Sequence, residues 1–328
     1  MNRKNLMKNF VLLALIIMMT GCGKPSNVNG QEPVVTKQAP VRVIFDTDMC
    51  FDVDDVGALA IINAMEDNGE DTLLAVCYNE VNKYGAAAID AINTWYGRGN
   101  TPIGIYKKTL ANPDTSPYLK YLAAFPNDIS SDDLSKVPSA LNVYIQTLES
   151  QPDSSVTIIS VGFLNNLYDL LTSRPKLIAQ KVKKLVIMGA VNNDDFNLVR
   201  HNLVSESEKV LKDWPTPIVI SQLGGNVYTG VVLQTTPSGN PVREAYYRWF
   251  HEQYKGRPSW DPLAALYAIR GQKYPYFNLV TTGTGSLPNG FVYHMKAGWR
   301  SYDTKNLTNT EFENLLNSLM TQPPKLGK

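Results

Sequence analysis

Cysteine is scarce in this chain of 328 residues, which contains only three. Cys22 belongs to an N-terminal targeting segment, so Cys50 and Cys77 alone remain for the rest of the chain. Two cysteines do not make a disulfide framework, and this excludes the class of small domains that are held together by several disulfides. We expect both thiols at the ends of neighbouring strands, where they could pair in an oxidising compartment or stay free.

An excess of charge of one sign is also lacking. The chain has 31 Lys and Arg residues and 30 Asp and Glu residues, and charged residues make up only 19% of it. Nothing in this balance indicates a nucleic acid or an acidic membrane surface as a partner. The chain also lacks internal repeats and a second-domain boundary, and its length suits one large α/β domain.

The N-terminus has the features of a bacterial lipoprotein signal peptide. A basic start is followed by an apolar run, residues 10–19, which is too short to span a bilayer stably. Met19-Thr20-Gly21-Cys22 then resembles a lipoprotein box. We expect cleavage before Cys22 and lipidation of its thiol, which would anchor the chain in the bacterial cell envelope, in the periplasm or at the surface. The alternative is an ordinary secretory signal with an incidental cysteine.

The sequence therefore divides into three parts. Residues 1–22 are predicted to be the signal peptide with the lipidated cysteine. Residues 23–40 are rich in Pro, Gln, Asn and Ser without a periodic apolar pattern, which is typical of a flexible tether. Residues 41–328 are predicted to form the folded domain.

The most informative stretch runs from Val41 to Ala60. It begins as an apolar, β-branched run typical of a buried strand and ends as the start of an apolar helix. Five aspartates lie between the two within ten residues: Asp46, Asp48, Asp52, Asp54 and Asp55. One or two of them need no further explanation, because Asp52 or Asp54 could be the N-cap of the helix. Five carboxylates raise one another's cost of ionisation, and a divalent cation relieves that cost far more than a helix N-terminus does. Oxygen ligands favour Ca²⁺ or Mg²⁺, so we interpret the stretch as a metal site.

Two known acidic motifs can be compared with this stretch. An EF-hand that begins at Asp46 would need Gly at position 51 and Glu at position 57, where the chain has Phe51 and Gly57. The haloacid-dehalogenase pattern matches Asp46 and Asp48, but it has a small hydroxyl residue where the chain has Cys50. The first motif is excluded, and the second is kept as a weaker alternative.

The rest of the chain alternates between apolar strand patterns and helical patterns. This order predicts an α/β fold with an open, mainly parallel sheet and helices on both faces. The predicted strands are 41–45, 72–77, 101–106, 156–161, 184–188 and 217–220. The predicted helices begin near residues 56, 83, 139, 165, 206, 241, 262 and 308, and 107–137 is predicted to be a long loop. Residues 277–302 change to short strands with Gly-rich turns, and we predict a small antiparallel edge there.

Ligands in open parallel sheets bind outside the carboxyl ends of the strands. This rule nominates the acidic stretch, Asn79, the Val161-Gly162 turn and the segment after Met188, because each follows a predicted strand. All four are polar or rich in glycine. Together they predict a ligand site at one edge of the sheet.

The segment DTDMCFDVDDVGALA, residues 46–60, resembles the N-terminal signature of inosine-uridine-preferring nucleoside hydrolases. The spacing from Asp48 to the Asp54-Asp55 pair is two residues longer than in the commonest form, and Asp52 corresponds to an additional Asp of a secreted bacterial branch. Further matches follow in order, and they extend the resemblance to the C-terminus: Asn79, Val161–Asn166, Val186–Gly189, Asp195–Asn197, Trp214–Val219 and Gly256–Asp261.

The resemblance implies a nucleoside-hydrolase-like fold and a Ca²⁺-dependent cleavage of the N-ribosidic bond. The implied calcium ligands are Asp48, Asp55, the carbonyl of Val161 and Asp261, and Asp52 adds a carboxylate beside them. Asp48 would be the general base, and the ribose hydroxyls would be bound by Asp54, Asn79, Asp195 and Asn197. The chemistry is consistent, because cleavage builds positive charge on the ribose and a carboxylate-rich pocket stabilises that charge.

The leaving base requires its own activation. Some members of the family protonate it with a His immediately before the last Asp ligand, where this chain has Trp260. We expect stacking on Trp260 instead, although a core tryptophan near a helix start is the alternative. His201 follows the Asp195–Asn197 segment and is the histidine that could reach the site, whereas His251 and His294 lie in other patterns.

Four positions depart from the family pattern. Cys50-Phe51 replace a Gly and a polar residue, which would remove backbone freedom if a positive φ were needed there. Gln222 stands where the branch often has Glu, and Asp195 is one methylene shorter than the usual Glu. These changes are compatible with an altered riboside substrate or a weakened enzyme.

Two rival functions remain open. The first is a haloacid-dehalogenase-type phosphohydrolase with Asp46 as its nucleophile and Mg²⁺. The second is a lipoprotein that captures ribose or nucleosides without cleaving them. The favoured prediction is a lipid-anchored nucleoside hydrolase with a small-molecule substrate, no nucleic acid partner, and a homo-oligomer among the states that the sequence allows.

Overall fold

The computed structural model describes residues 39–271 and 273–325. The predicted signal peptide, Cys22 and nearly all of the predicted tether lie outside these residues. Residues Ala39–Lys328 form one compact unit. No helix within the described residues is both long enough and apolar enough to cross a membrane.

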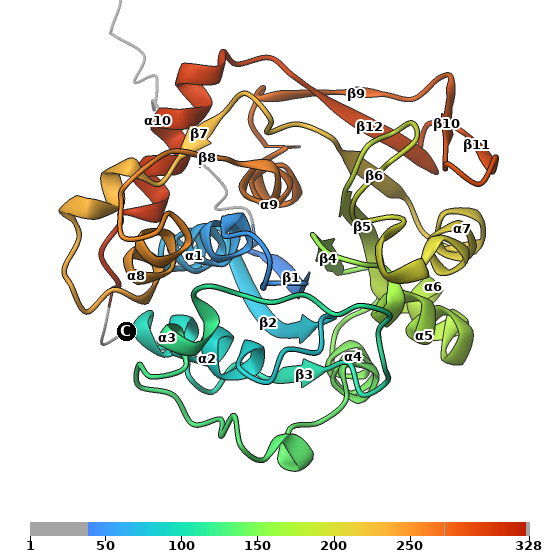
Figure 1. The fold of residues 1–328 in the computed structure, drawn as a ribbon. Coiled ribbons are helices and arrows are strands. Elements are labelled where there is room, and N and C mark those ends of the chain that lie inside the picture. Colours follow the sequence, from blue (N-terminus) through green and yellow to red (C-terminus); the bar gives the residue numbers. More distant parts are fainter. Residues whose placement is uncertain (1–38, 272, 326–328) are drawn as a thin grey trace, which may run out of the picture. The chain divides into compact units, whose positions relative to one another are not determined.

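An eight-stranded sheet forms the centre of the unit (Figure 1), with the strand order β3-β2-β1-β4-β5-β6-β12-β9. All neighbouring strands in it are parallel except β12 and β9. The strands are β1 (Val41–Thr47), β2 (Asp71–Tyr78), β3 (Ile103–Ile105), β4 (Val156–Ser160), β5 (Val182–Met188), β6 (Ile218–Ser221), β9 (Phe277–Val280) and β12 (Arg300–Lys305). Two small antiparallel pairs lie outside it, β7 (Tyr228–Thr229) with β8 (Arg257–Pro258) and β10 (Thr284–Ser286) with β11 (Val292–His294).

Helices cover both faces of this sheet, as the alternating pattern predicts (Figure 1). The α-helices are α1 (Asp54–Asp67), α2 (Gly85–Trp95), α3 (Leu119–Leu122), α4 (Ala140–Glu149), α5 (Asn165–Ser173), α6 (Pro175–Lys181), α7 (Val204–Asp213), α8 (Pro241–Trp249), α9 (Trp260–Arg270) and α10 (Asn309–Met320). Short 3₁₀ turns are η1 (Leu134–Lys136), η2 (Arg200–Asn202) and η3 (Val231–Thr235). Helix α10 begins with a capping box between Thr308 and Glu311.

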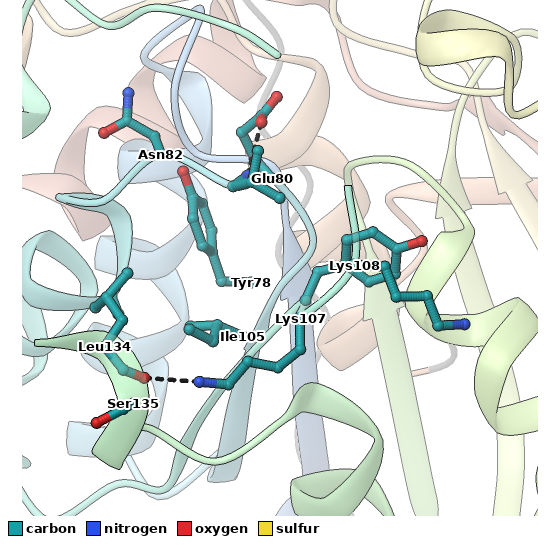
Figure 2. Close-up of a pocket in the computed structure, with 11 residues that line it drawn as sticks. Tyr78, Glu80, Asn82, Ile105, Lys107, Lys108, Leu134 and Ser135 are labelled. Atoms are coloured by element: carbon teal, nitrogen blue, oxygen red, sulfur yellow. Dashed lines mark hydrogen bonds between the residues drawn. The ribbon is translucent and has the colours of Figure 1, made fainter. Parts of the chain in front are cut away.

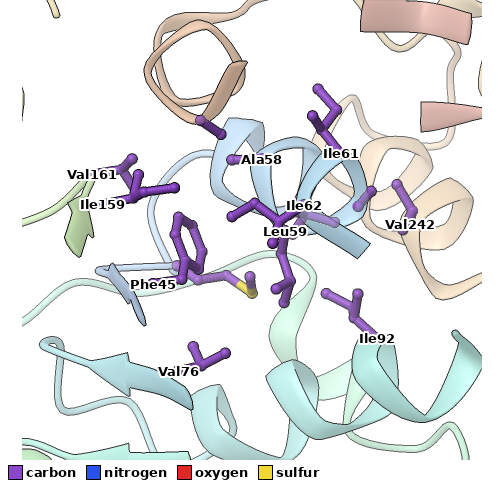
Figure 3. Packing of buried hydrophobic residues seen from close by; sticks show 14 of the residues in the cluster. Phe45, Ala58, Leu59, Ile61, Ile62, Val76, Ile92, Ile159, Val161 and Val242 are labelled. Atoms are coloured by element: carbon purple, nitrogen blue, oxygen red, sulfur yellow. The ribbon is translucent and has the colours of Figure 1, made fainter. Parts of the chain in front are cut away.

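Two apolar cores result from the alternation of side chains along the strands. Phe45 points to the face covered by α1, α2, α9 and α10, whereas its neighbour Ile44 points to the face covered by α4, α5, α6 and α7. Figure 3 shows the first core, in which Leu59 and Ile62 of α1 pack with Phe45 and Val76 of the sheet. Both side chains of α1 are fully buried, and burial of one such aliphatic side chain contributes about 1.5–3 kcal/mol.

The predicted antiparallel edge is present, and one of its strands also extends the main sheet. β9 pairs with β12 in antiparallel register, and β10 pairs with β11. β12 in addition pairs in parallel register with β6. This second pairing has no local signature, because the periodicity of a strand does not specify its neighbours.

The strand order places a topological switch point between β1 and β4. The chain runs outward from β1 to β2 and β3, and then returns to start β4 on the other side of β1. The segments after β1 and β4 therefore diverge at the carboxyl end of the sheet, which leaves room for a ligand. These are the acidic stretch and the Val161-Gly162 turn.

The two cysteines of the domain are free and lie in different cores. Cys50 is buried in the core on the α1 side, and Cys77 is buried in the core on the α4 side. The sheet separates the two thiols, so the pairing that the sequence left open does not form.

Candidate functional site

The acidic stretch forms the start of α1, with Asp54 and Asp55 in its first turn. A negative charge is favourable there, because the first backbone N–H groups of a helix lack partners. Thr47, at the end of β1, donates its hydroxyl to Asp55 Oδ1 and accepts a hydrogen bond from the N–H of Met49 at 3.1 Å. The strand end thus fixes one oxygen of Asp55 and the path of the loop.

Helix α9 brings Asp261 to the same place. Asp54 Oδ2 accepts hydrogen bonds from the backbone N–H groups of Trp260 at 3.1 Å and of Asp261 at 3.4 Å. Asp54 therefore occupies the N-terminus of α9 as well as that of its own helix. Asp261 lies in the first turn of α9 and is buried among the aspartates of the loop.

The clustered carboxyl groups destabilise one another in their charged forms. Burial first, and then the charges of Asp55 and Asp52, raise the pKa of Asp48 well above its usual value. Burial and neighbouring aspartates likewise raise the pKa of Asp55 and of Asp261 well above the ordinary range. Oδ2 of Asp55 and Oδ1 of Asp261 are buried without a hydrogen-bond partner. A cation would supply both the missing ligand and the compensating charge, although the structure does not bring ligand atoms of three of these aspartates within 4.8 Å of one another.

The turn after β4 completes the set of oxygen donors. The carbonyl oxygen of Val161 accepts a hydrogen bond from Nδ2 of Asn197. A Cβ atom on Gly162 would lie 2.6 Å from the N atom of Asp48 and 2.7 Å from Asn79 Oδ1, so only glycine allows this close approach. Asn79 Oδ1 is itself buried without a hydrogen-bond partner. Carboxylate, amide and carbonyl oxygens together are the donor set that Ca²⁺ prefers.

An arginine that the sequence analysis missed balances part of the negative charge. Arg257 Nη2 lies 2.7 Å from Asp52 Oδ2, and its Nε lies 3.1 Å from Asp54 Oδ1. Its guanidinium also lies 4.9 Å from the ring centroid of Trp249 and 5.0 Å from that of Trp260. Burial still outweighs the arginine and raises the pKa of Asp52 to about 7. The only signal for this residue was its place in the GRPSWD segment.

Asp46 belongs to a closed hydrogen-bond network. Its Oδ1 accepts from Asn79 at 2.6 Å, and its Oδ2 accepts from Tyr144 at 2.9 Å and from Asn166 at 3.1 Å. Asp46 is fully buried, and burial raises its pKa to about 7 although the three donors lower it. Neither oxygen is free to attack a substrate, which argues against the role of nucleophile in a phosphohydrolase.

A cavity of about 450 Å³ opens beside the acidic cluster, a size suited to a small-molecule ligand. It is lined by four of the residues that the sequence nominated: Asp52, Asp195, Asn197 and Trp260. Asp195 is exposed, whereas the neighbouring Asp194 is buried and accepts three backbone hydrogen bonds. The remaining lining residues are Phe51, Met188, Gly189, Ala190, Asp194, Phe196, Gln222 and Arg257.

His201 lies elsewhere. Its side chain is only 3% exposed, and its Nε2 faces Glu80 Oε2 at 3.6 Å and Asp114 Oδ2 at 3.7 Å. It is not among the residues that line the 450 Å³ cavity, and neither are His251 and His294. Trp260 therefore remains the aromatic candidate for activation of the leaving base. Sequence reasoning missed Glu80 and Asp114, although Glu80 directly follows Asn79 at a strand end.

The departures from the family pattern have a simple structural outcome. Neither Cys50 nor Phe51 has a positive φ, so the loop needs no glycine at either position. Phe51 is 52% exposed and contributes its ring to the cavity. Gln222 lines the same cavity, and its Oε1 accepts a hydrogen bond from the N–H of Val191 at 3.3 Å.

Comparisons with known proteins identify the fold. No protein-family model matches the chain, and no curated protein matches it in sequence. Among solved structures, an inosine-uridine-preferring nucleoside hydrolase from Bacillus anthracis has a TM-score of 0.63 and 16% identity over 86% of this chain and 99% of its own. A purine-preferring ribonucleoside hydrolase from Gardnerella vaginalis has a TM-score of 0.64 and 15% identity over 87% of this chain and 100% of its own.

A third similar structure is the type III effector protein XopQ complexed with adenosine diphosphate ribose, with a TM-score of 0.63 and 14% identity over 88% of this chain and 94% of its own. The TM-scores establish a shared fold, whereas sequence identities this low do not establish a shared activity. The chain has the fold of the nucleoside hydrolases.

Proposed function

We propose that this chain hydrolyses the N-ribosidic bond of nucleosides or related ribosides in a Ca²⁺-dependent reaction that gives ribose and the free base. The observation that carries the proposal is the pair of orphaned carboxylate oxygens on Asp55 and Asp261, in an acidic cluster whose member Asp52 lines a cavity of about 450 Å³. The shared fold also supports hydrolysis of the N-ribosidic bond, because two of the similar structures are named as nucleoside hydrolases.

Asp48, Asp55, Asp261 and the carbonyl of Val161 would hold the cation, with Asp52 beside them. When bound, Ca²⁺ would orient vicinal ribose hydroxyls and acidify a water molecule. Burial and one another's charge raise the pKa values of Asp48, Asp55 and Asp261, so their charged forms are unfavourable without a counter-charge. Arg257 compensates part of the negative charge of the cluster, and a cation would compensate the rest.

The side chains around the cation have separate roles in this proposal. Asp48 takes a proton from the attacking water, as a buried carboxylate with a raised pKa can do. Asp195 and Asn197, which line the cavity, would hold ribose hydroxyls, and Asn79 would do so through its unpartnered Oδ1. Asp54 has both oxygens engaged by Arg257 and by α9 amides, so it would reach the ribose by exchanging one of these contacts.

Positive charge that develops on the ribose is stabilised by the surrounding carboxylates. The leaving base would stack on Trp260, which lines the cavity and lies against Arg257. No histidine of the described chain lines this cavity, so stacking takes the place of protonation by His201. The lipid anchor at Cys22, the location in the cell envelope and a homo-oligomer remain part of the proposal.

The experiment is an assay of the purified chain with a panel of purine and pyrimidine ribonucleosides in millimolar Ca²⁺. Free base and reducing sugar are measured together, with and without EDTA. We expect equal amounts of both products and loss of turnover on chelation. Nucleoside binding without sugar release would instead establish the capture protein, and phosphate release from sugar phosphates would establish a phosphohydrolase.

A further inference from the structure

A second group of ligand-type side chains lies outside the proposed catalytic set. Glu80 follows β2, Asp114 lies in the long loop after β3, and His201 follows β5. One ligand atom from each residue lies within 4.8 Å of the other two. The side chains of Glu80 and His201 are 0% and 3% exposed, so the group is almost enclosed.

The histidine is oriented as a metal ligand would be. His201 Nδ1 lies 2.8 Å from the carbonyl oxygen of Ala111. A carbonyl only accepts, so Nδ1 donates this hydrogen bond, and Nε2 is the ring nitrogen that faces the carboxylates. Nε2 is buried and has no hydrogen-bond partner. A hydrogen bond from the other ring nitrogen to a backbone carbonyl is the usual support of a metal-bound imidazole. The ring of Phe163 packs edge-on against the ring of His201, with 4.3 Å between the two ring centroids.

The separations distinguish a metal bridge from the alternatives. Nε2 lies 3.6 Å from Glu80 Oε2 and 3.7 Å from Asp114 Oδ2. A direct charge-assisted hydrogen bond would bring these atoms to about 2.7–2.9 Å, and a bridging water would separate them by roughly 4.5 Å. Two ligand atoms that each lie about 2.0–2.2 Å from the same metal ion are roughly 3.3–3.7 Å apart when the angle between the two bonds is tetrahedral or somewhat larger. The observed spacing matches the metal bridge.

The carboxylates are also held in place and only partly neutralised. Glu80 Oε1 accepts from the N–H of Val81 at 2.7 Å, and Oε2 accepts from the N–H of Asp114 at 3.3 Å. Arg200 pairs with Asp114 and leaves Glu80 as the uncompensated charge. Glu80 is also one of the residues that line a separate cavity of about 310 Å³, shown in Figure 2.

We propose that Glu80, Asp114 and His201 form a second divalent cation site of the transition-metal type, which takes Zn²⁺. An imidazole nitrogen with two carboxylates favours Zn²⁺ over Ca²⁺, which prefers oxygen alone. The ion ties together three loops that surround the strand ends. This inference does not depend on the proposed hydrolase activity.

The test uses the full chain without a histidine tag, freed of metal with EDTA and returned to millimolar Ca²⁺. Calorimetric titration with Zn²⁺ is expected to show one saturable site per chain, and Co²⁺ is expected to give a visible absorbance band. H201Q and E80Q should each weaken Zn²⁺ binding by at least about tenfold, because loss of a direct ligand exceeds the loss of its support. H251Q and H294Q, which change the two exposed histidines, are the matched controls and should bind as the wild type does.

D261N, which changes an oxygen ligand of the proposed calcium site, should keep the Zn²⁺ site. Circular dichroism confirms the fold of each variant, and if H201Q does not fold, E80Q carries the test. Absence of a saturable site in the wild type, or unchanged Zn²⁺ affinity in a folded H201Q or E80Q, would overturn the proposal.

Discussion

Asp54 accepts a hydrogen bond from the backbone N–H of Asp261 at 3.4 Å, across 207 positions of sequence. This contact joins the first turns of α1 and α9, and both turns carry site carboxylates. Arg257, just before α9, binds the other oxygen of Asp54. The acidic loop and the distant Asp261 are therefore held together by the chain itself, before any ligand binds.

Replacement of Asp261 by Asn is predicted to stabilise the metal-free chain and to abolish its response to calcium. The raised pKa of Asp261 means that its charged form is unfavourable in the fold, so the wild type loses stability as the pH rises towards the folded pKa. Ca²⁺ at 100 times its Kd would add about 2.7 kcal/mol to the wild type. Thermal melts with Ca²⁺ and with EDTA measure both effects.

The control for this comparison is D132N, which changes an exposed aspartate and should keep the calcium response. An equal rise of Tm with Ca²⁺ in D261N and in the wild type would contradict the proposed ligand set.

Gly162→Ala is predicted to displace Asp48. The added Cβ would lie 2.6 Å from Asp48 N and 2.7 Å from Asp48 Oδ1, so the turn or the aspartate must move. We expect a loss of about 1–3 kcal/mol in unfolding free energy and a large loss of turnover. Denaturant unfolding and the sugar-release assay test this. Gly239→Ala is the matched control, since its nearest neighbour would be Trp95 at 3.8 Å, and wild-type turnover in G162A would refute the argument.

Trp260→Ala is predicted to lower kcat/KM for nucleosides by about 10- to 100-fold, because stacking of one base on an aromatic ring contributes about 1–3 kcal/mol. Trp260→Phe should keep most of the activity. The measurement is the initial rate of base release, with Trp299→Ala as the control because that tryptophan is outside the cavity lining. Equal rates for W260A and the wild type would exclude Trp260 as the stacking residue.

Asp46→Asn separates the hydrolase from the phosphohydrolase. The amide would place a donor against groups that now donate to Asp46, and we expect a loss of about 1–3 kcal/mol in stability. Ribose release should continue, because Asp46 has no free oxygen for the reaction. Complete loss of turnover in a variant whose fold is intact by circular dichroism would instead support Asp46 as a nucleophile.

Asp303→Asn is predicted to stabilise the protein at neutral and higher pH. Burial raises the pKa of Asp303 from 3.8 to about 7, although Ser221 donates to it. A folded pKa above the unfolded one means that the wild type loses stability as the pH rises from about 4 to about 7, by up to roughly 4 kcal/mol. D303N has no such loss, so the difference in urea-unfolding free energy should grow over this range and then level off. A difference that does not change with pH would contradict the shift.

The sequence predicted the elements that have strong local patterns. Phe45, Val76 and Ile159 lie in short β-branched runs, and such runs became the central strands because burial on both faces favours them. The rule for strand ends then placed Asp48, Asn79 and Val161 together before any distance was known. Asp195 and Asn197 also line the cavity, and their binding of ribose hydroxyls stays a prediction.

Contacts between distant segments were beyond the sequence. Nothing near Arg257 indicates that it binds Asp52 and Asp54, since an ion pair across about 200 residues leaves no local pattern. The same holds for His201, whose partner Asp114 lies in a loop without periodicity. Such pairings follow from the order of strands in the sheet, and that order is a tertiary property.

The separation of Cys50 and Cys77 by the sheet has a consequence for stability. An intramolecular disulfide between them would require a rearrangement of the fold, because the two thiols lie in different cores. We therefore expect reducing agents to leave the melting temperature of the described domain unchanged.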